Sequence, residues 1–112
     1  MARTKKSRKQ IALIGAGKIG KLTTRLLQKK YQVTVYDLDK DRAKESAGPK
    51  GAYERLDINQ AKDLRRALKG KELIISCCPY YCNEKIAQAA AETNVAYCDL
   101  SEDVASGKAI ER

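Results

Sequence analysis

The sequence contains no histidine, no phenylalanine and no tryptophan, and it has no long apolar run. Without histidine, a cysteine nucleophile would lack its usual imidazole base, and a zinc site would need cysteine ligands alone. Without Phe and Trp, the core must consist of Leu, Ile, Val, Ala and the six Tyr residues. Because the long apolar run is missing, we expect neither a membrane span nor a secretory signal.

Length and charge limit what this chain can be. Its 112 residues allow one domain with one core. Four cysteines without a secretory signal indicate reduced thiols and a cytoplasmic protein. The formal charge is +9, and residues 1–9 hold five basic residues and no acidic one. Since no aromatic residue is interleaved with these charges, we expect residues 1–9 to be a disordered lead-in that binds no nucleic acid, and residues 10–112 to form the domain.

A glycine-rich motif follows the first apolar stretch. Ile11-Ala12-Leu13-Ile14 is predicted to be a short strand, and it leads into Gly15-Ala16-Gly17-Lys18-Ile19-Gly20. Leucines at helical spacing follow, and a second strand over residues 32–36 delivers Asp37 to its end. A strand, a glycine turn, a helix, a second strand and a terminal acid are typical of dinucleotide-binding Rossmann folds. We therefore predict that residues 15–20 and Asp37 bind the cofactor.

Each glycine of the motif has a predicted physical role. Gly15 allows a sharp turn out of the strand, Gly17 leaves room for a pyrophosphate, and Gly20 allows the helix to pack closely on the sheet. The free N–H groups at the start of that helix then face the phosphates. The helical spacing also predicts a stripe of Ile19, Leu22 and Leu26 on the sheet, with Lys18, Lys21 and Arg25 facing away.

Asp37 indicates which dinucleotide is preferred. A carboxylate at the end of the second strand can accept both hydroxyls of the adenosine ribose and would repel a 2′-phosphate. The sequence therefore favours NAD over NADP. Lys40 and Arg42 follow closely enough to allow NADP as well.

A nucleotide-hydrolysing P-loop is an alternative interpretation of the same residues. Gly15 and Gly20-Lys21 satisfy most of its pattern, but Leu22 stands where a Ser or Thr hydroxyl would bind magnesium. Thr23 comes one residue late, and Gly17 has no role in that pattern. The dinucleotide interpretation accounts for these residues better.

Strands and helices alternate along the rest of the chain. Strands are expected at 52–56, 73–77 and 95–100, and 73–77 is as apolar as a central parallel strand covered on both faces. Helices are expected at 41–46, between Asn59 as N-cap and Gly70, after Asn83 as N-cap, and from about Glu102. Right-handed crossovers then predict an α/β fold, with a doubly wound parallel sheet of order 3-2-1-4-5 in a single domain.

The carboxyl ends of the strands are the expected binding region in such a sheet. Besides the glycine turn, these ends carry further candidate cofactor contacts: Asp37, Leu38, Asp57, Ile58, Cys78, Pro79 and Tyr80. The segment at 57–58 would lie beside the adenine, and the segment at 78–80 near the ribose and nicotinamide. No residue of this chain is predicted to be catalytic.

Cys77, Cys78 and Cys82 lie close together in the sequence and raise the question of a metal site. Adjacent residues of a strand point to opposite sides, so Cys77 and Cys78 could not easily share one ion. We expect the thiols to be small packing residues around the fourth strand, and we predict no metal.

Two later segments resemble a particular family. Residues 74–83 read Ile-Ile-Ser-Cys-Cys-Pro-Tyr-Tyr-Cys-Asn, and residues 96–103 read Ala-Tyr-Cys-Asp-Leu-Ser-Glu-Asp. They resemble the Pro-Tyr pair and the Tyr-x-Asp-Leu-Ser/Thr-Glu-Asp run of the saccharopine dehydrogenase and lysine dehydrogenase-like family. The resemblance extends over nearly the whole chain, from about residue 10 to about residue 110.

The resemblance implies an NAD(P)-dependent oxidoreductase that acts on the CH–NH group of an amino acid, with Pro79 and Tyr80 near the nicotinamide. Members of this family continue into a substrate domain. The resemblance therefore implies that this chain is the N-terminal domain of a longer enzyme and binds cofactor without turnover. A small-molecule amino-acid substrate, such as lysine or saccharopine, would bind with the help of the missing domain, and the parent could be a homodimer.

A cofactor-sensing module is the alternative function. Regulatory domains of potassium uptake systems share the glycine turn and have an Asp-x-Asp after the second strand, which Asp37 and Asp39 match. Such domains respond to NAD or a nucleotide by changing shape and do no chemistry. The segments around Pro79 and Asp99 favour the dehydrogenase.

Overall fold

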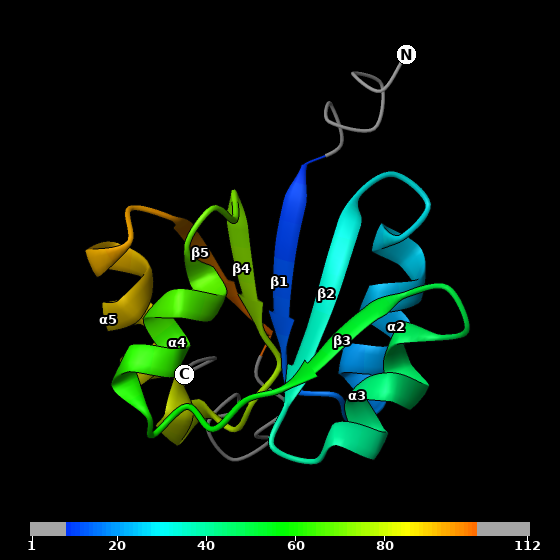
Figure 1. The fold of residues 1–112 in the computed structure, drawn as a ribbon, viewed down its shortest axis with the longest axis horizontal. Helices are drawn as coiled ribbons and strands as arrows, with labels where there is room; N and C mark the ends of the chain where they lie inside the picture. Colours follow the sequence, from blue (N-terminus) through cyan, green and yellow to red (C-terminus); the bar gives the residue numbers. More distant parts are fainter. Residues whose placement is uncertain (1–8, 101–112) are drawn as a thin grey trace, which may run out of the picture.

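Five parallel strands form one sheet in the order β3-β2-β1-β4-β5 (Figure 1). The computed structural model describes residues 9–100, and the side chain of Tyr80 lies outside this description. The strands are β1 (Gln10–Ile14), β2 (Gln32–Asp37), β3 (Ala52–Arg55), β4 (Leu73–Ser76) and β5 (Ala96–Asp99). The helices between them are α2 (Lys18–Leu27), α3 (Lys40–Ala47), α4 (Ala61–Leu68) and α5 (Tyr80–Glu92). The predicted fold class and strand order are confirmed.

Helices cover both faces of the sheet, with α2 and α3 on one side and α4 and α5 on the other (Figure 1). Alternate residues of β1 point to the two sides. Leu13 packs with Ala43 and Ala47 of α3, whereas Ile14 packs with residues of α4 and α5 such as Leu68. This double coverage explains why the central strands are apolar throughout rather than alternating. No helix within residues 9–100 is long and apolar enough to cross a membrane.

The C-terminal turn of α3 is fixed by side chains from α2. The Arg25 guanidinium donates hydrogen bonds to the carbonyl oxygens of Glu45 (3.0 Å) and Ser46 (3.2 Å), and the Gln28 amide donates to that of Ala47 (2.7 Å). The last carbonyls of a helix have no partner within the helix and carry partial negative charge, so a guanidinium is well suited to them. At the other end of α3, the Asp39 side chain caps the helix by accepting from two backbone N–H groups.

The predicted packing stripe of α2 is wrong for its two leucines. Leu22 and Leu26 are 58% and 57% exposed, whereas Gly20 and Thr24 are buried and Ile19 packs partly against the sheet. The helix is rotated so that its smallest residues meet the sheet, because Gly20 lies directly over the end of β1. A period of 3.6 residues then turns Leu22 and Leu26 away from the core.

Several element boundaries also differ from the sequence prediction. The helix α3 extends one residue beyond the expected 41–46 at each end, and Gln60 rather than Asn59 occupies the N-cap of α4. The helix α5 begins after Pro79, so Asn83 lies inside it instead of capping it. The strands β3 and β5 are shorter than expected. The helix predicted from Glu102 lies outside the described residues.

The rotation of α2 predicts unequal effects of two leucine truncations. Leu26→Ala should change the free energy of unfolding by no more than about 0.5 kcal/mol, because more than half of this residue is already exposed to water. Leu68→Ala, at 0% exposure in α4, should cost about 2–5 kcal/mol through lost burial and a cavity. Urea unfolding of the two variants compares them directly, and equal losses would mean that α2 is rotated differently.

Candidate cofactor site

A cavity of about 800 Å³ lies at the carboxyl ends of the strands. Its walls come from the β1–α2 turn, the end of β2, the β3–α4 loop, and the turn between β4 and α5. The lining residues are Ile14, Gly15, Ala16, Gly17, Lys18, Asp37, Leu38, Arg42, Leu56, Asp57, Ile58, Asn59, Cys77, Cys78, Pro79, Tyr81, Cys82 and Lys85. Its position is the one at which open α/β sheets bind ligands, and its volume suits a large organic ligand.

The glycine turn forms the part of the wall that backs onto the sheet. Gly15 has φ +103°, and a Cβ there would lie 2.9 Å from the backbone carbon of Cys77. A Cβ on Gly20 would lie 2.1 Å from the Gly15 carbonyl oxygen. Gly15 also donates its N–H to the Tyr36 carbonyl at 2.8 Å, which continues the pairing of β1 with β2. Both positions therefore require glycine. Gly15 needs it for its positive φ and for space, and Gly20 needs it for space alone.

The start of α2 borders the cavity and has no side-chain cap. Gly17 is the N-cap residue in an extended conformation, and the first turn contains no acidic residue. Helix N-termini present unsatisfied N–H groups and partial positive charge. A phosphate group in the cavity could satisfy these groups.

Asp37 connects the end of β2 to the glycine turn. Its Oδ2 accepts the N–H of Ala16 at 2.8 Å, and its Oδ1 accepts the N–H of Asp39 at 2.8 Å. Each carboxylate oxygen has two acceptor sites, so each can still accept a hydroxyl. The residue predicted to bind ribose is thus also part of the scaffold that shapes the turn.

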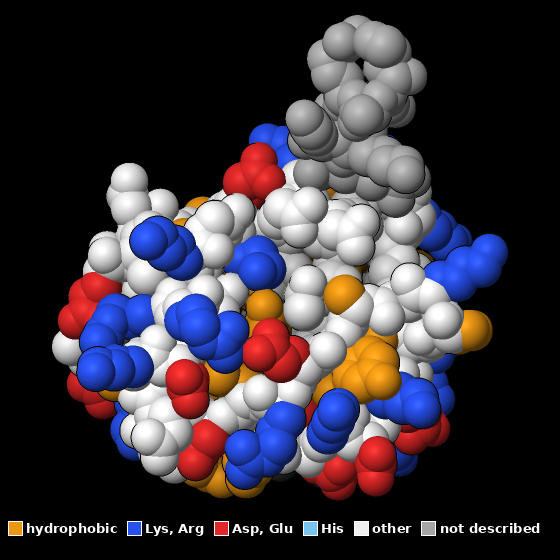
Figure 2. All heavy atoms as spheres, viewed as in Figure 1, with side chains coloured by type: hydrophobic (Ala, Val, Ile, Leu, Met, Phe, Trp, Pro, Cys, Tyr) orange, Lys and Arg blue, Asp and Glu red, His pale blue; other side chains and the backbone are white. Residues whose placement is uncertain are grey.

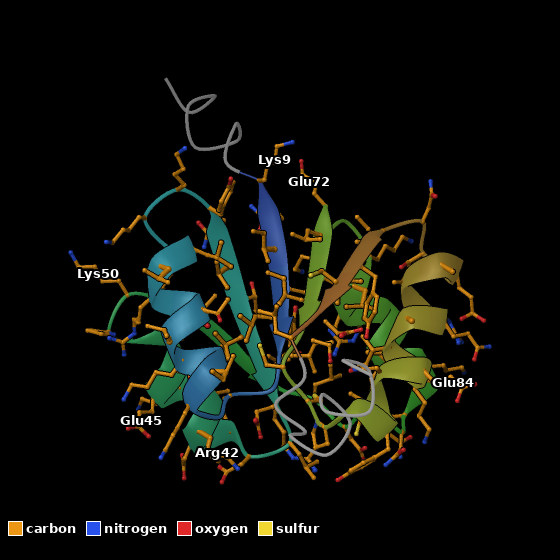
Figure 3. All side chains as sticks on the ribbon, turned by 180° about the vertical axis from the view of Figure 1, so that it is seen from behind. Lys9, Arg42, Glu45, Lys50, Glu72 and Glu84 are labelled. Carbon is orange, nitrogen blue, oxygen red and sulfur yellow. The ribbon has the colours of Figure 1, made fainter. Side chains whose placement is uncertain are left out.

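Charges of both signs line the cavity. Lys18, Arg42 and Lys85 contribute positive charge, and Asp37 and Asp57 contribute negative charge. Figure 3 shows Arg42 near the ends of the strands, whereas Lys9 and Glu72 lie at the opposite end of the molecule. Lys and Arg side chains are interspersed with Asp and Glu on the face seen in Figure 2.

The β4–α5 turn is held by a small polar network. The Ser76 hydroxyl, which is buried, donates to Asn83 Oδ1 at 2.7 Å, and the Cys78 N–H donates to Ser76 Oγ at 3.4 Å. The Tyr97 hydroxyl donates to the Asn83 carbonyl at 3.5 Å. Burial raises the pKa of Tyr97, so its hydroxyl keeps its proton and acts as a donor. The network orients the turn that carries Cys78 and Pro79.

The cysteines around β4 pack on opposite faces of the sheet, as strand alternation predicts. Cys77 belongs to the α2/α3 side and Cys78 to the α4/α5 side. Burial and the nearby Cys82 raise the pKa of Cys78 to about 12. In the described part of the chain, no three Cys, Asp or Glu residues are grouped as a metal site.

The structure brings most of the sequence-predicted site residues to this cavity: Gly15, Ala16, Gly17, Lys18, Asp37, Leu38, Asp57, Ile58, Cys78 and Pro79. Ile19 and Gly20 do not line it, and Gly20 acts instead through helix packing. The side chain of Tyr80 lies outside the described residues. Sequence reasoning missed Asn59 and Lys85, whose side chains are hydrogen-bonded to each other across the cavity wall. Asn59 adjoins the predicted 57–58 segment and could have been included, whereas Lys85 depends on the rotation of α5.

Gly20→Ala is predicted to be strongly destabilising, although alanine favours helices. The new Cβ would meet a backbone oxygen, so we expect a loss of at least about 2 kcal/mol in the free energy of unfolding. Gly70→Ala is the matched control, because Gly70 has φ +84° but nothing lies within 4 Å of its Cβ position. It should cost only about 1 kcal/mol of backbone strain. Chemical unfolding tests both, and a Gly20→Ala variant as stable as wild type would contradict the close packing of α2.

Cys78 is predicted to be slow to alkylate. With a pKa of about 12, only about one thiol in ten thousand is ionised at pH 8, and its rate should rise with pH throughout the range 7.5–9.5. The exposed Cys98 should react first. Timed iodoacetamide labelling with peptide mass spectrometry measures both rates. Equal rates at pH 8 would show that Cys78 is neither buried nor raised in pKa.

Comparison with known proteins gives the site its context. The sequence profile described as saccharopine dehydrogenase NADP binding domain matches residues 11–111. Saccharopine dehydrogenase (L-Glu forming) from Saccharomyces cerevisiae superposes with a TM-score of 0.78 at 22% identity, covering 81% of this chain and 21% of the yeast enzyme. A short-chain dehydrogenase/reductase from Veillonella parvula in complex with NADP superposes with a TM-score of 0.70 at 21% identity, covering 88% of this chain and 50% of the other.

A third solved structure carries the same fold. The triphenylmethane reductase of Citrobacter sp., complexed with NADP(H), superposes with a TM-score of 0.65 at 25% identity. The match covers 78% of this chain and 36% of the reductase. This chain spans about a fifth of the yeast saccharopine dehydrogenase. The profile match extends over nearly the whole chain and confirms the resemblance seen in the sequence. The chain therefore belongs to the saccharopine dehydrogenase NADP binding domain family and is a Rossmann domain of the NAD(P)-binding class.

Proposed function

We propose that this chain binds NAD(P) in the cavity at the strand ends and is the cofactor domain of an oxidoreductase that acts on the CH–NH group of an amino acid. One observation carries the proposal. The uncapped start of α2, the glycine turn and the Asp37 carboxylate border a single cavity, in a member of this family. Bound NAD(P)+ would supply the acceptor for hydride from the carbon that bears the nitrogen.

The cavity residues suit the separate parts of a dinucleotide. Gly17 and the first turn of α2 would hold the pyrophosphate through backbone N–H groups. Asp37 would accept hydroxyls of the adenosine ribose, and Ile58 would offer an apolar contact beside the adenine. Cys78 and Pro79, on the turn after β4, would lie near the nicotinamide half.

Asp37 and Arg42 would act in opposite directions on cofactor choice. The Asp37 carboxylate repels a 2′-phosphate and favours NAD, as the sequence predicts. Arg42 also lines the cavity and can neutralise a 2′-phosphate through its guanidinium. We therefore propose that both cofactors bind, with the 2′-phosphate dependent on Arg42.

The amino acid itself would need groups that this chain does not contribute. The chain spans about a fifth of the yeast enzyme, and its sequence has no histidine to move a proton near neutral pH. We propose that the chain binds cofactor without oxidising an amino acid. A cytoplasmic location and a homodimeric parent also remain predictions.

Calorimetric titration of the chain with NADH and NADPH tests the proposal. Saturable binding of both is expected for wild type. Arg42→Ala should weaken the binding of NADPH about tenfold or more, because one charge-assisted contact with the 2′-phosphate is lost. The affinity for NADH should stay nearly unchanged. Asp37→Asn should weaken the binding of NADH and reduce any preference for NADH over NADPH.

Control variants keep the charge changes matched. Lys44→Ala removes a basic residue from the exposed side of the same helix as Arg42, and Asp63→Asn neutralises an exposed acid on α4. Both should bind like wild type. The proposed function fails if folded wild-type protein binds neither cofactor.

A further inference from the structure

We propose that Ser46 on α3 is a positioning residue for cofactor binding, because it orients the backbone of the glycine turn toward the pyrophosphate. The Ser46 hydroxyl donates to the Ala16 carbonyl oxygen at 3.1 Å, across 30 residues of sequence. The effect on cofactor binding rests on the proposed function, whereas the bond from Ser46 to Ala16 does not.

Ser46 occupies a place where alanine would be the ordinary choice. It is 1% exposed on the helix face that packs against the sheet, between the buried Ala43 and Ala47. Alanine has the higher helix propensity, and burying a hydroxyl is unfavourable unless it forms a hydrogen bond. Helical serines commonly bond to the carbonyl four residues earlier, whereas this one bonds to the turn.

The bond fixes the orientation of one peptide unit. The peptide between Ala16 and Gly17 is trans, so its C=O and N–H point in opposite directions. With the Ala16 carbonyl held toward α3, the Gly17 N–H must point away from α3. Gly17 borders the cavity, and no acceptor among the described residues takes its N–H. This is one of the N–H groups assigned above to the pyrophosphate.

Hydrogen bonds from other elements hold the polar groups on either side of the Ala16 carbonyl. The Ala16 N–H is held by Asp37 Oδ2, and the Gly17 carbonyl accepts the Lys21 N–H at 2.8 Å in the first turn of α2. Among the described residues, the Ser46 hydroxyl is the donor that holds the Ala16 carbonyl, so this carbonyl would lose that hydrogen bond if the hydroxyl were removed. Ser46 is itself fixed, because its own carbonyl accepts from Arg25. The helix α3 thus serves as the support of the phosphate-binding turn.

The test combines one measurement without ligand and one with ligand. In 15N-labelled Ser46→Ala, the backbone 15N signal of Gly17 should move upfield, because the carbonyl of the same peptide loses its hydrogen bond. The dissociation constant for NADPH should rise about three- to tenfold, the value of one hydrogen bond. That for adenosine 2′-phosphate, which has no pyrophosphate, should stay within twofold of wild type. Ser46→Thr, which keeps the hydroxyl, should restore the Gly17 signal and NADPH affinity.

The controls separate this inference from the proposed function. Lys44→Ala, on the exposed side of α3, should leave both readouts unchanged, and Ser46→Cys replaces Ser46→Ala if the latter unfolds. An unchanged Gly17 signal in folded protein overturns the inference. An equal loss of affinity for NADPH and for adenosine 2′-phosphate overturns it as well. If wild type binds neither compound, the proposed function fails, and the Gly17 signal of the ligand-free chain still decides whether Ser46 orients the peptide.

Discussion

The close approach of α2 to the end of β1 is the constraint on which the site depends. The Gly20 backbone lies so near the Gly15 carbonyl that a methyl group would not fit between them. This contact determines the rotation of α2 about its axis, which buries Thr24 and leaves Leu22 and Leu26 in solvent. It also places the N-terminus of the helix beside the cavity. The glycines therefore act first on packing, and the position of the helix N-terminus beside the cavity follows from that packing.

The helix α3 provides the second support. Its N-terminus is tied to Asp37 through the backbone of Asp39, and its last turn is held by Arg25 from α2. Ser46 connects that turn to Ala16. Bonds from β2, α2 and α3 thus hold residues 15–17 of the glycine turn, and a turn held in this way need not reorganise when a phosphate arrives. Such preorganisation is what gives backbone N–H groups their affinity for anions.

The electrostatics of the cavity fit a cofactor that carries both ribose hydroxyls and phosphates. Asp37 offers an acceptor close to the backbone donors of α2, and Arg42 adds a cation within the same cavity. The partly buried thiol of Cys78 keeps its proton because its pKa is raised to about 12, so it adds no negative charge beside the site. These features suit the binding of a dinucleotide cofactor.

The sequence by itself determined the fold class, the strand order and most of the cavity. Hydrophobic runs, glycine spacing and the right-handed crossover rule act locally or follow from chirality, so they can be read without coordinates. The tertiary structure alone decided the rotation of α2, the place of Asn83 inside α5 and the bond from Ser46 to Ala16. The place of Asn83 depends on the start of α5 after Pro79, whereas the rotation of α2 and the Ser46 bond depend on which side of a helix meets the rest of the domain. That side is determined by tertiary contacts. At the start of α2, for example, the backbone of Gly20 lies so close to the Gly15 carbonyl that no larger residue fits at position 20.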